Sequence, residues 1–153
     1  MIAFRAHKNG MSQQGGFVPL TYNPLEMSTE DYDIGSRYSN SLWVPVAIGE
    51  ADKLVTFSGQ VWCPYDGGLG ALNGNSNIVA RIIKNGYQGG TTIGTGIATK
   101  GPFQYDWNLM LSMQDIAHAG DSYGLYLYVT NGGTWVDGNP LHTFWCGSCK
   151  TDC

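Results

Sequence analysis

The chain has 153 residues, of which 42% are hydrophobic, so it is about one domain long and can bury a single sizeable core. Charged residues account for 13% and aromatic residues for 12%, the opposite of the composition of disordered chains. A formal net charge of -4 argues against nucleic acid as a direct partner, and no apolar run approaches the roughly 20 residues of a membrane-spanning helix.

The first part of the chain is typical of short strands separated by turns. Gly, Asn, Ser, Thr and Tyr occur throughout, and no segment repeats strong helix formers at the helical period. Residues 2–7 predict a first strand, and residues 17–23 predict an edge-type strand because Pro19 cannot donate a ladder hydrogen bond. We expect residues 26–33 to form an acidic loop and residues 37–46 to form an extended segment.

The middle of the chain contains a clear alternation. Residues 53–63 place Val55, Phe57, Gly59 and Val61 on one face and the residues between them on the other. A period of two is the signature of a strand with two different faces.

Three further strands are expected after the central one. Residues 77–84 form a β-branched segment that ends in Asn85-Gly86, a strong signal for a type I′ turn. Residues 91–99 and residues 103–113 have the same strand-like composition.

The last third of the chain predicts a long alternating strand and a short closing strand, at residues 141–147. In residues 121–129, one face carries Tyr123, Leu125, Leu127 and Val129, and the other carries Ser122, Gly124, Tyr126 and Tyr128. The complete pattern amounts to about nine or ten strands, with turn signals roughly every ten residues. It predicts an all-β sandwich or jelly roll that occupies residues 1–153 as a single domain.

The sequence contains no convincing set of catalytic groups. His7, His118 and His142 are far apart and lie in or beside expected strands. Ser122, His118 and Asp121 could be combined as a triad, but no Gly-x-Ser-x-Gly turn supports this combination. We therefore predict that the protein is not an enzyme and needs no cofactor.

The four cysteines leave three interpretations open. Cys146 and Cys149 form a Cys-x-x-Cys pair near Cys153, whereas Cys63 is distant in the sequence. A zinc clip would need a second pair at matched spacing, so a disulfide and free thiols remain as alternatives. The acidic residues 26–33 could hold calcium, but they lack the regular pattern of a calcium-binding loop, and this question also stays open.

Six segments, read in order, form a recognisable pattern: Phe4-Arg5-Ala6, Val18 to Asn23, Ser41 to Gly49, Ile78 to Gly86, Ala119-Gly120-Asp121 and Thr143 to Gly147. Together they resemble the globular head of the complement C1q-like and tumour-necrosis-factor-like superfamily. The resemblance covers nearly the whole chain and implies a ten-strand jelly-roll sandwich that assembles as a threefold trimer around an apolar axis.

The abundance of aromatic residues independently suggests an interface. Five Trp, nine Tyr and five Phe residues exceed what one small sandwich core needs, and aromatic residues are enriched at interfaces. We predict a homotrimer, with Tyr126, Tyr128, Phe144 and Trp145 as candidate subunit contacts.

The glycine-rich loops are the expected recognition surface, because loops on a rigid sandwich usually carry binding residues. These loops span residues 64–76, 87–94 and 131–140. The aromatic side chains that we expect to contact a partner are Trp62, Tyr65, Tyr87 and Trp135.

Two functional classes follow. The first is a non-enzymatic viral structural accessory protein, such as a capsid decoration, head fibre or receptor-binding tip, displayed on the virion surface as a trimeric jelly roll. This class is favoured by the start at Met1 directly before the first strand, without a signal peptide. Its partners would be capsid or tail proteins and a host receptor or glycan. The alternative is a secreted complement- or lectin-like binding head.

Overall fold

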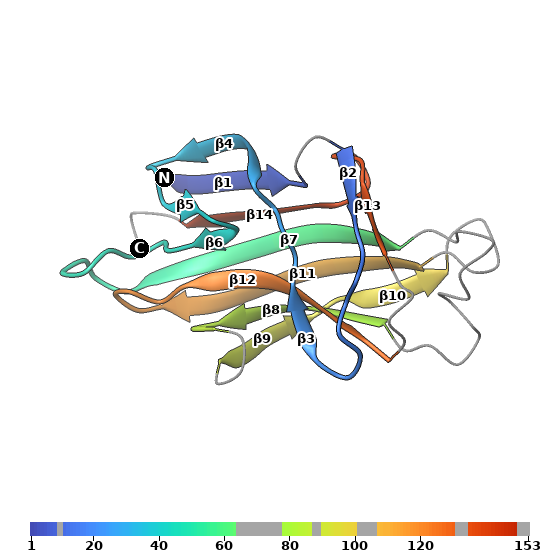
Figure 1. Ribbon diagram of the computed structural model, residues 1–153. Helices are drawn as coiled ribbons and strands as arrows, with labels where there is room; N and C mark the ends of the chain where they lie inside the picture. Colours follow the sequence, from blue (N-terminus) through green and yellow to red (C-terminus); the bar gives the residue numbers. More distant parts are fainter. Residues whose placement is uncertain (9–10, 64–77, 87–89, 101–106, 131–134, 150–153) are drawn as a thin grey trace.

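The computed structural model describes residues 1–8, 11–63, 78–86, 90–100, 107–130 and 135–149. The described residues form strands β1 to β14 in two packed antiparallel sheets, with one additional strand pair (Figure 1). Within this part of the chain there is no helix of the length and hydrophobicity that crossing a membrane requires. The architecture is an all-β jelly-roll sandwich, as the sequence predicted.

The larger sheet has six strands in the order β10-β11-β7-β14-β1-β4. Their bounds are β10 Ile97–Lys100, β11 Trp107–Ala117, β7 Lys53–Cys63, β14 Phe144–Cys149, β1 Ile2–His7 and β4 Thr29–Ile34. The first and last long strands of the chain, β1 and β14, are antiparallel neighbours, with Ile2 opposite Cys149. The jelly roll is therefore closed by pairing between the two ends of the described chain.

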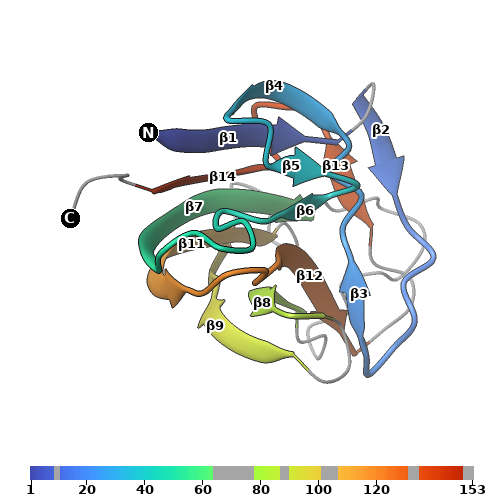
Figure 2. The ribbon, with the colours of Figure 1, turned by 90° about the vertical axis from the view of Figure 1, so that its left-hand side faces the viewer.

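The smaller sheet has the strand order β5-β6-β12-β8-β9, and β3 pairs with β12 beside it. Their bounds are β5 Tyr38–Ser39, β6 Leu42–Trp43, β12 Tyr123–Val129, β8 Ile78–Lys84, β9 Thr91–Thr95 and β3 Tyr22–Pro24. A separate pair joins β2 (Met11–Gln14) to β13 (Val136–Gly138). Figure 2 shows the smaller sheet packed beside the larger one, with β3 running next to β12.

Aromatic side chains fill the core between the sheets. The ring of Phe4 lies 5.0 Å from that of Trp43 and 4.7 Å from that of Trp145, and all three side chains are buried. Gly147 makes this cluster possible, because a Cβ at that position would lie 2.6 Å from the Phe4 ring. The absence of a side chain at Gly147 thus admits two large rings, Phe4 from the neighbouring strand β1 and Trp43 from β6 of the opposite sheet.

The expected alternation in residues 53–63 is confirmed. Val55, Phe57, Gly59 and Val61 are buried, and the residues between them lie on the outer surface. The Asn85-Gly86 turn is also confirmed, with positive φ angles of 59° and 98°.

Two predictions for the first part of the chain were wrong. Of the expected strand at 17–23, only residues 22 and 23 are extended, as part of β3, because the Asn23 side chain bonds to the backbone N–H and C=O of Val18 and closes a turn. The expected acidic loop contains strand β4, whose acidic side chains suit a solvent-exposed sheet edge.

The predicted strand at residues 91–99 divides at Gly96. Its first part, β9, pairs with β8 in the smaller sheet, and its second part, β10, pairs with β11 in the larger sheet. Short strands of two to four residues raise the total above the expected ten, because such lengths leave no periodic pattern in a sequence.

Candidate functional site

The two sheets expose outer surfaces of different character. We call the outward side of β11, β7, β14, β1 and β4 the β7 face, and the outward side of β3, β12 and β8 the β12 face. Strand register fixes which side chains share each face, because directly opposed residues of neighbouring strands point the same way.

The middle of the β7 face carries small side chains. Ser112, Ser58, Cys146, Arg5 and Tyr32 are successive partners across its five strands. The three small residues of this row leave a hollow of ≈ 290 Å³, which is also lined by side chains from the next row. Within the hollow, Cys146 Sγ lies 2.9 Å from Ser58 Oγ.

Large apolar side chains are exposed elsewhere on the β7 face and, at Tyr32, in the lining of the hollow. They are Tyr32 at 44% exposure, Ile34 at 45%, Leu54 at 41%, Met110 at 47% and Ile116 at 48%. Leu54 and Ile116 are direct partners across β7 and β11, so they form one continuous apolar contact. A cluster of large exposed apolar side chains on one sheet face is a feature of association surfaces.

The cation of the β7 face is neutralised within the chain. The Arg5 guanidinium lies 4.7 Å from the centre of the Phe144 ring and is paired with the Asp31 carboxylate. Arg5 Nη2 also donates to the Pro140 carbonyl at 3.3 Å. The face therefore presents apolar and small polar groups with little net charge.

The β12 face is covered by tyrosine rings. Tyr22 and Tyr128 are partners across β3 and β12, and their rings lie 5.3 Å apart with an interplanar angle of 46°. Tyr126 lies on the same side as Tyr128, and its ring folds over Gly124, where a Cβ would come within 2.9 Å of Tyr126 Cε2. Arg81 is the β8 partner of Tyr126.

The Arg81 side chain crosses the surface of β12. Strands β8 and β3 pair with opposite sides of β12, yet the Arg81 guanidinium lies 4.9 Å from the centre of the Tyr22 ring on β3. The Nε atom of Arg81 is buried without a hydrogen-bond partner. The β12 face thus combines two half-buried tyrosine rings with one guanidinium group.

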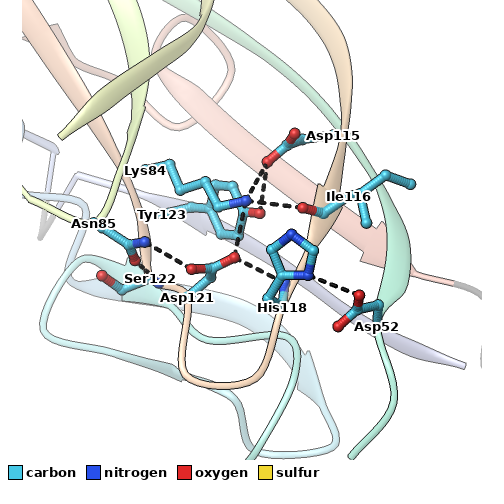
Figure 3. Close-up of polar contacts among 9 residues, drawn as sticks. All are labelled: Asp52, Lys84, Asn85, Asp115, Ile116, His118, Asp121, Ser122 and Tyr123. Carbon is cyan, nitrogen blue, oxygen red and sulfur yellow. Dashed lines mark hydrogen bonds and ion pairs between the residues drawn. The ribbon is translucent and has the colours of Figure 1, made fainter.

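A polar network joins the two sheets at one end of the sandwich (Figure 3). Lys84 Nζ on β8 lies 3.0 Å from Asp115 Oδ2 on β11 and 2.8 Å from Asp121 Oδ2 before β12. Burial alone would lower the pKa of Lys84, but the bonds to Asp121 and Asp115 outweigh it and raise that pKa. The Asn85 amide donates to the other oxygen of Asp121 at 2.6 Å.

This network does not assemble the triad that Ser122, His118 and Asp121 could form on paper. The backbone N–H of His118 donates to Asp121, while the His118 ring is paired with Asp52 at 2.7 Å. The Ser122 backbone N–H bonds to the Asn85 side chain. Asp121 therefore pairs with Lys84 and accepts hydrogen bonds from two turns, at Asn85 and at His118, and its role here is structural.

The described cysteines are free thiols on different sides of the larger sheet. Cys146 lies in the hollow of the β7 face, whereas Cys149 and Cys63 are buried. Burial raises the pKa of the Cys63 thiol, which disfavours the thiolate needed of a nucleophile. Cys146 and Cys149 are three positions apart along one strand, so their side chains point to opposite faces of the sheet and cannot share one metal. No metal-holding group of His, Cys, Asp or Glu occurs among the described residues.

The four predicted trimer contacts occupy three different places. Phe144 lies on the β7 face, and Tyr126 and Tyr128 lie on the β12 face. Trp145 is fully buried in the core, and its Nε1 donates to the Tyr38 hydroxyl at 3.2 Å. The assignment of Trp145 is corrected accordingly, because consecutive strand residues face opposite sides.

The predicted recognition residues are only partly described. Tyr65 and Tyr87 lie outside the described residues. Trp62 is the penultimate residue of β7, and its ring packs edge-on against that of His142, with 4.1 Å between the ring centres. Trp135 precedes β13 and is half-buried. Among the described residues, neither the Trp62 ring nor the Trp135 ring is paired with Tyr22 or Tyr128 of the β12 face.

The sequence reasoning missed three groups that shape these surfaces. Arg81 and Tyr22 are distant in the sequence, and only the pairing of β3 and β8 with β12 brings them together. Ile116 fell outside the strand expected at residues 103–113. Continuing the alternation of that strand by a few residues would have placed Ile116 beside Leu54.

Comparisons with known proteins support the fold alone. No protein-family model and no curated protein matches the sequence. Murine APRIL is similar with a TM-score of 0.64 and 9% identity, over 95% of this chain and 96% of that one. Eiger TNF from S. frugiperda is similar with a TM-score of 0.60 and 13% identity, over 99% of this chain and 94% of that one. The globular domain of zebrafish complement 1qA is similar with a TM-score of 0.53 and 10% identity, over 95% of this chain and 94% of that one. The chain therefore has the jelly-roll fold shared by tumour-necrosis-factor-like proteins and complement C1q heads.

Proposed function

We propose that this protein is a non-enzymatic binding head that assembles as a homotrimer through its β7 face. The observation that carries this proposal is the group of exposed apolar side chains around Leu54 and Ile116, on a face whose cation is already neutralised. A surface of this kind gains most free energy by burial against a like surface. Closed threefold symmetry buries the same patch on each subunit.

The hollow on the same face suits assembly. Small side chains at Ser58, Ser112 and Cys146 leave room for a larger side chain from a neighbouring copy. The same face exposes Met110, whose flexible thioether adapts to an irregular partner surface. Phe144 is the predicted contact that lies on this face.

The non-enzymatic part of the proposal rests on the arrangement of the polar groups. Lys84, Asp115 and Asp121 satisfy one another, and the His118 ring is engaged by Asp52. Catalysis needs a base directed at a nucleophile within an accessible site. Within the described chain, these groups are instead used to hold turns and sheets together.

We place the trimer on the surface of a virus particle, as a capsid decoration, head fibre or receptor-binding tip. The free thiols of Cys63, Cys146 and Cys149 favour a protein assembled in a reducing compartment, such as a virion component made inside a host cell. A secreted binding head with the same fold is the alternative, and oxidised cysteines in the natural protein would favour it.

Native mass spectrometry tests the assembly with two matched variants. Leu54→Asp puts a charge on the β7 face, and Leu42→Asp puts the same charge on the β12 side at similar exposure, 38% against 41%. We expect trimers for the wild type and for Leu42→Asp, and monomers for Leu54→Asp. A monomeric wild type, or a trimer that is unaffected by Leu54→Asp, contradicts the proposed interface.

The particle assignment has its own test. Proteomic analysis of gradient-purified particles from the source culture should recover this chain together with capsid or tail proteins. Recovery only as free protein in the medium, with disulfides, would replace the virion assignment by the secreted alternative.

A further inference from the structure

The β12 face contains a cation, Arg81, for which the described residues supply no carboxylate. Five other cationic side chains, those of Arg5, Lys8, Arg37, Lys53 and Lys84, end on oxygen atoms of this chain. Arg37 and Lys53 reach Glu50, and Lys8 donates to the Gln14 side chain at 2.8 Å. Arg81 has no oxygen partner within the described part of the chain, and its recorded contact is the Tyr22 ring.

Arg5 supplies an internal comparison for this site. Its guanidinium also lies over an aromatic ring, that of Phe144, at 4.7 Å against 4.9 Å for Arg81 over Tyr22. At Arg5 the fold places a carboxylate, that of Asp31, on the guanidinium. At Arg81, no carboxylate of the described residues occupies the corresponding position. We propose that the β12 face binds an acidic sugar, whose carboxylate occupies this position on Arg81.

The guanidinium selects the charge of this ligand. A planar guanidinium binds a carboxylate through two parallel hydrogen bonds, and a partly desolvated site strengthens them. The cation–π contact with Tyr22 holds the group in place across β12 without using its outward N–H donors. One isolated cation on a chain of net charge -4 suits a ligand with one negative charge and disfavours a polyanion.

The tyrosine rings select the body of the ligand. Tyr22 and Tyr128 are half-buried, and their rings meet at an interplanar angle of 46°. The C–H faces of a pyranose ring are apolar and pack on such rings, and the tyrosine hydroxyls can bond to sugar hydroxyls. A short acidic peptide side chain would reach Arg81 but would leave the aromatic surface uncovered.

This inference deepens the proposed binding role by naming the class of ligand, but it depends neither on the trimer nor on the virion. The probe is methyl glucuronide, which carries one carboxylate on a sugar ring. Methyl glucoside differs from it only in having a hydroxymethyl group at that position. The α-amide of N-acetylglutamate supplies a carboxylate without a sugar ring.

Titration followed by the NMR signals of the tyrosine rings is the experiment. We expect saturable shifts of Tyr22 and Tyr128 with methyl glucuronide in the millimolar range. Methyl glucoside and the glutamate derivative should bind at least about tenfold more weakly, the effect of losing one charged hydrogen bond or the ring contact.

Three variants locate the site. Arg81→Gln should abolish the shifts, and Arg81→Lys, which keeps the charge but loses the planar fork, should weaken binding several-fold. Arg37→Gln is the matched control, because it removes one positive charge elsewhere and should leave binding unchanged. Thermal unfolding curves establish whether each variant is folded. If Arg81→Gln does not fold, Arg81→Lys provides the test.

The outcomes separate the two proposals. Absence of saturable binding by methyl glucuronide, or unchanged binding in folded Arg81 variants, overturns the acidic-sugar site while the mass measurements still decide the trimer. Equal or tighter binding of the glutamate derivative overturns the sugar assignment and points to an acidic peptide. Glucuronide binding by a protein that proves to be monomeric supports the site and rejects only the assembly.

Discussion

The β7 face and the β12 face are built from the same alternation but expose different chemistry. On the β7 face, the guanidinium of Arg5 is paired with the Asp31 carboxylate, and the side chains that remain exposed are apolar or small. On the β12 face, tyrosine rings cover the strand, and no carboxylate among the described residues is paired with the cation Arg81. The two faces therefore differ in both exposed apolar side chains and internal charge pairing, and on these two differences the proposed roles of the faces rest.

The two faces keep their separate positions because the two sheets of the sandwich are linked to each other. Lys84 links β8 of one sheet to Asp115 on β11 of the other, and only 15% of its side chain is exposed. Lys84→Met should therefore lower the free energy of unfolding by about 3 kcal/mol, because Asp115 and Asp121 lose their cation at a partly buried site. Lys53→Met, whose partner Glu50 is more exposed, should lower the free energy of unfolding much less. Urea unfolding measures both, and equal losses would contradict the role of Lys84.

The same network predicts a dependence on pH. Burial opposes ionisation of Asp121, but bonds from Lys84, Asn85 and the His118 backbone outweigh it and lower the pKa of this carboxyl. A lowered pKa means that Asp121 stabilises the fold above its ordinary value of 3.8, and that this contribution disappears as the pH falls through the folded-state value. In Lys84→Met, the loss of unfolding free energy that comes from protonating Asp121 at low pH should be smaller. If the free energy of unfolding has the same slope against pH in the wild type and in Lys84→Met below about pH 4, this assignment is rejected.

The next prediction uses Cys146 to sharpen the contrast between the faces. Its thiol lies in the hollow of the β7 face, so a trimer built through that face should protect it from maleimide. We expect Cys146 to react at least about tenfold faster in Leu54→Asp than in the wild type, the equivalent of about 1.4 kcal/mol. Cys63 and Cys149 are buried with raised pKa values, and both should stay unreactive in each protein.

Peptide mapping resolves the cysteine that reacts, and Leu42→Asp serves as the control with an intact β7 face. Equal labelling of Cys146 in the wild type and in both variants would show that this face is open in solution.

The smallest expected effect tests whether charge pairing is what separates the two faces. Asp31→Asn leaves Arg5 over Phe144 without its carboxylate, the arrangement found at Arg81. Stability should fall by only about 0.5 kcal/mol, because this pair is partly solvated. In a Leu54→Asp background, the new open cation should bind methyl glucuronide weakly, as new shifts of the Phe144 ring signals. No shift at Phe144 would show that the tyrosine rings are required as well.

The periodic segments were predictable because alternation is a local property. Residues 53–63 and 121–129 place their core residues as the pattern indicated, and the Asn85-Gly86 turn was recognised from its two residues. The choice of both Phe144 and Trp145 as contacts conflicts with the same rule, since neighbours in a strand cannot share a face. Consistent use of alternation would have placed Trp145 in the core.

What the sequence determined by itself is the all-β class, the long strands and their inward faces, since these follow from composition and a period of two. Only the tertiary structure decided which strands are neighbours. Three contacts depend on it: the cation–π contact of Arg81 with Tyr22 across β12, the ion pair of Arg5 with Asp31, and the ion pair of Lys84 with Asp115. Such contacts join residues far apart in the chain, and strand register, which a single sequence does not encode locally, sets them.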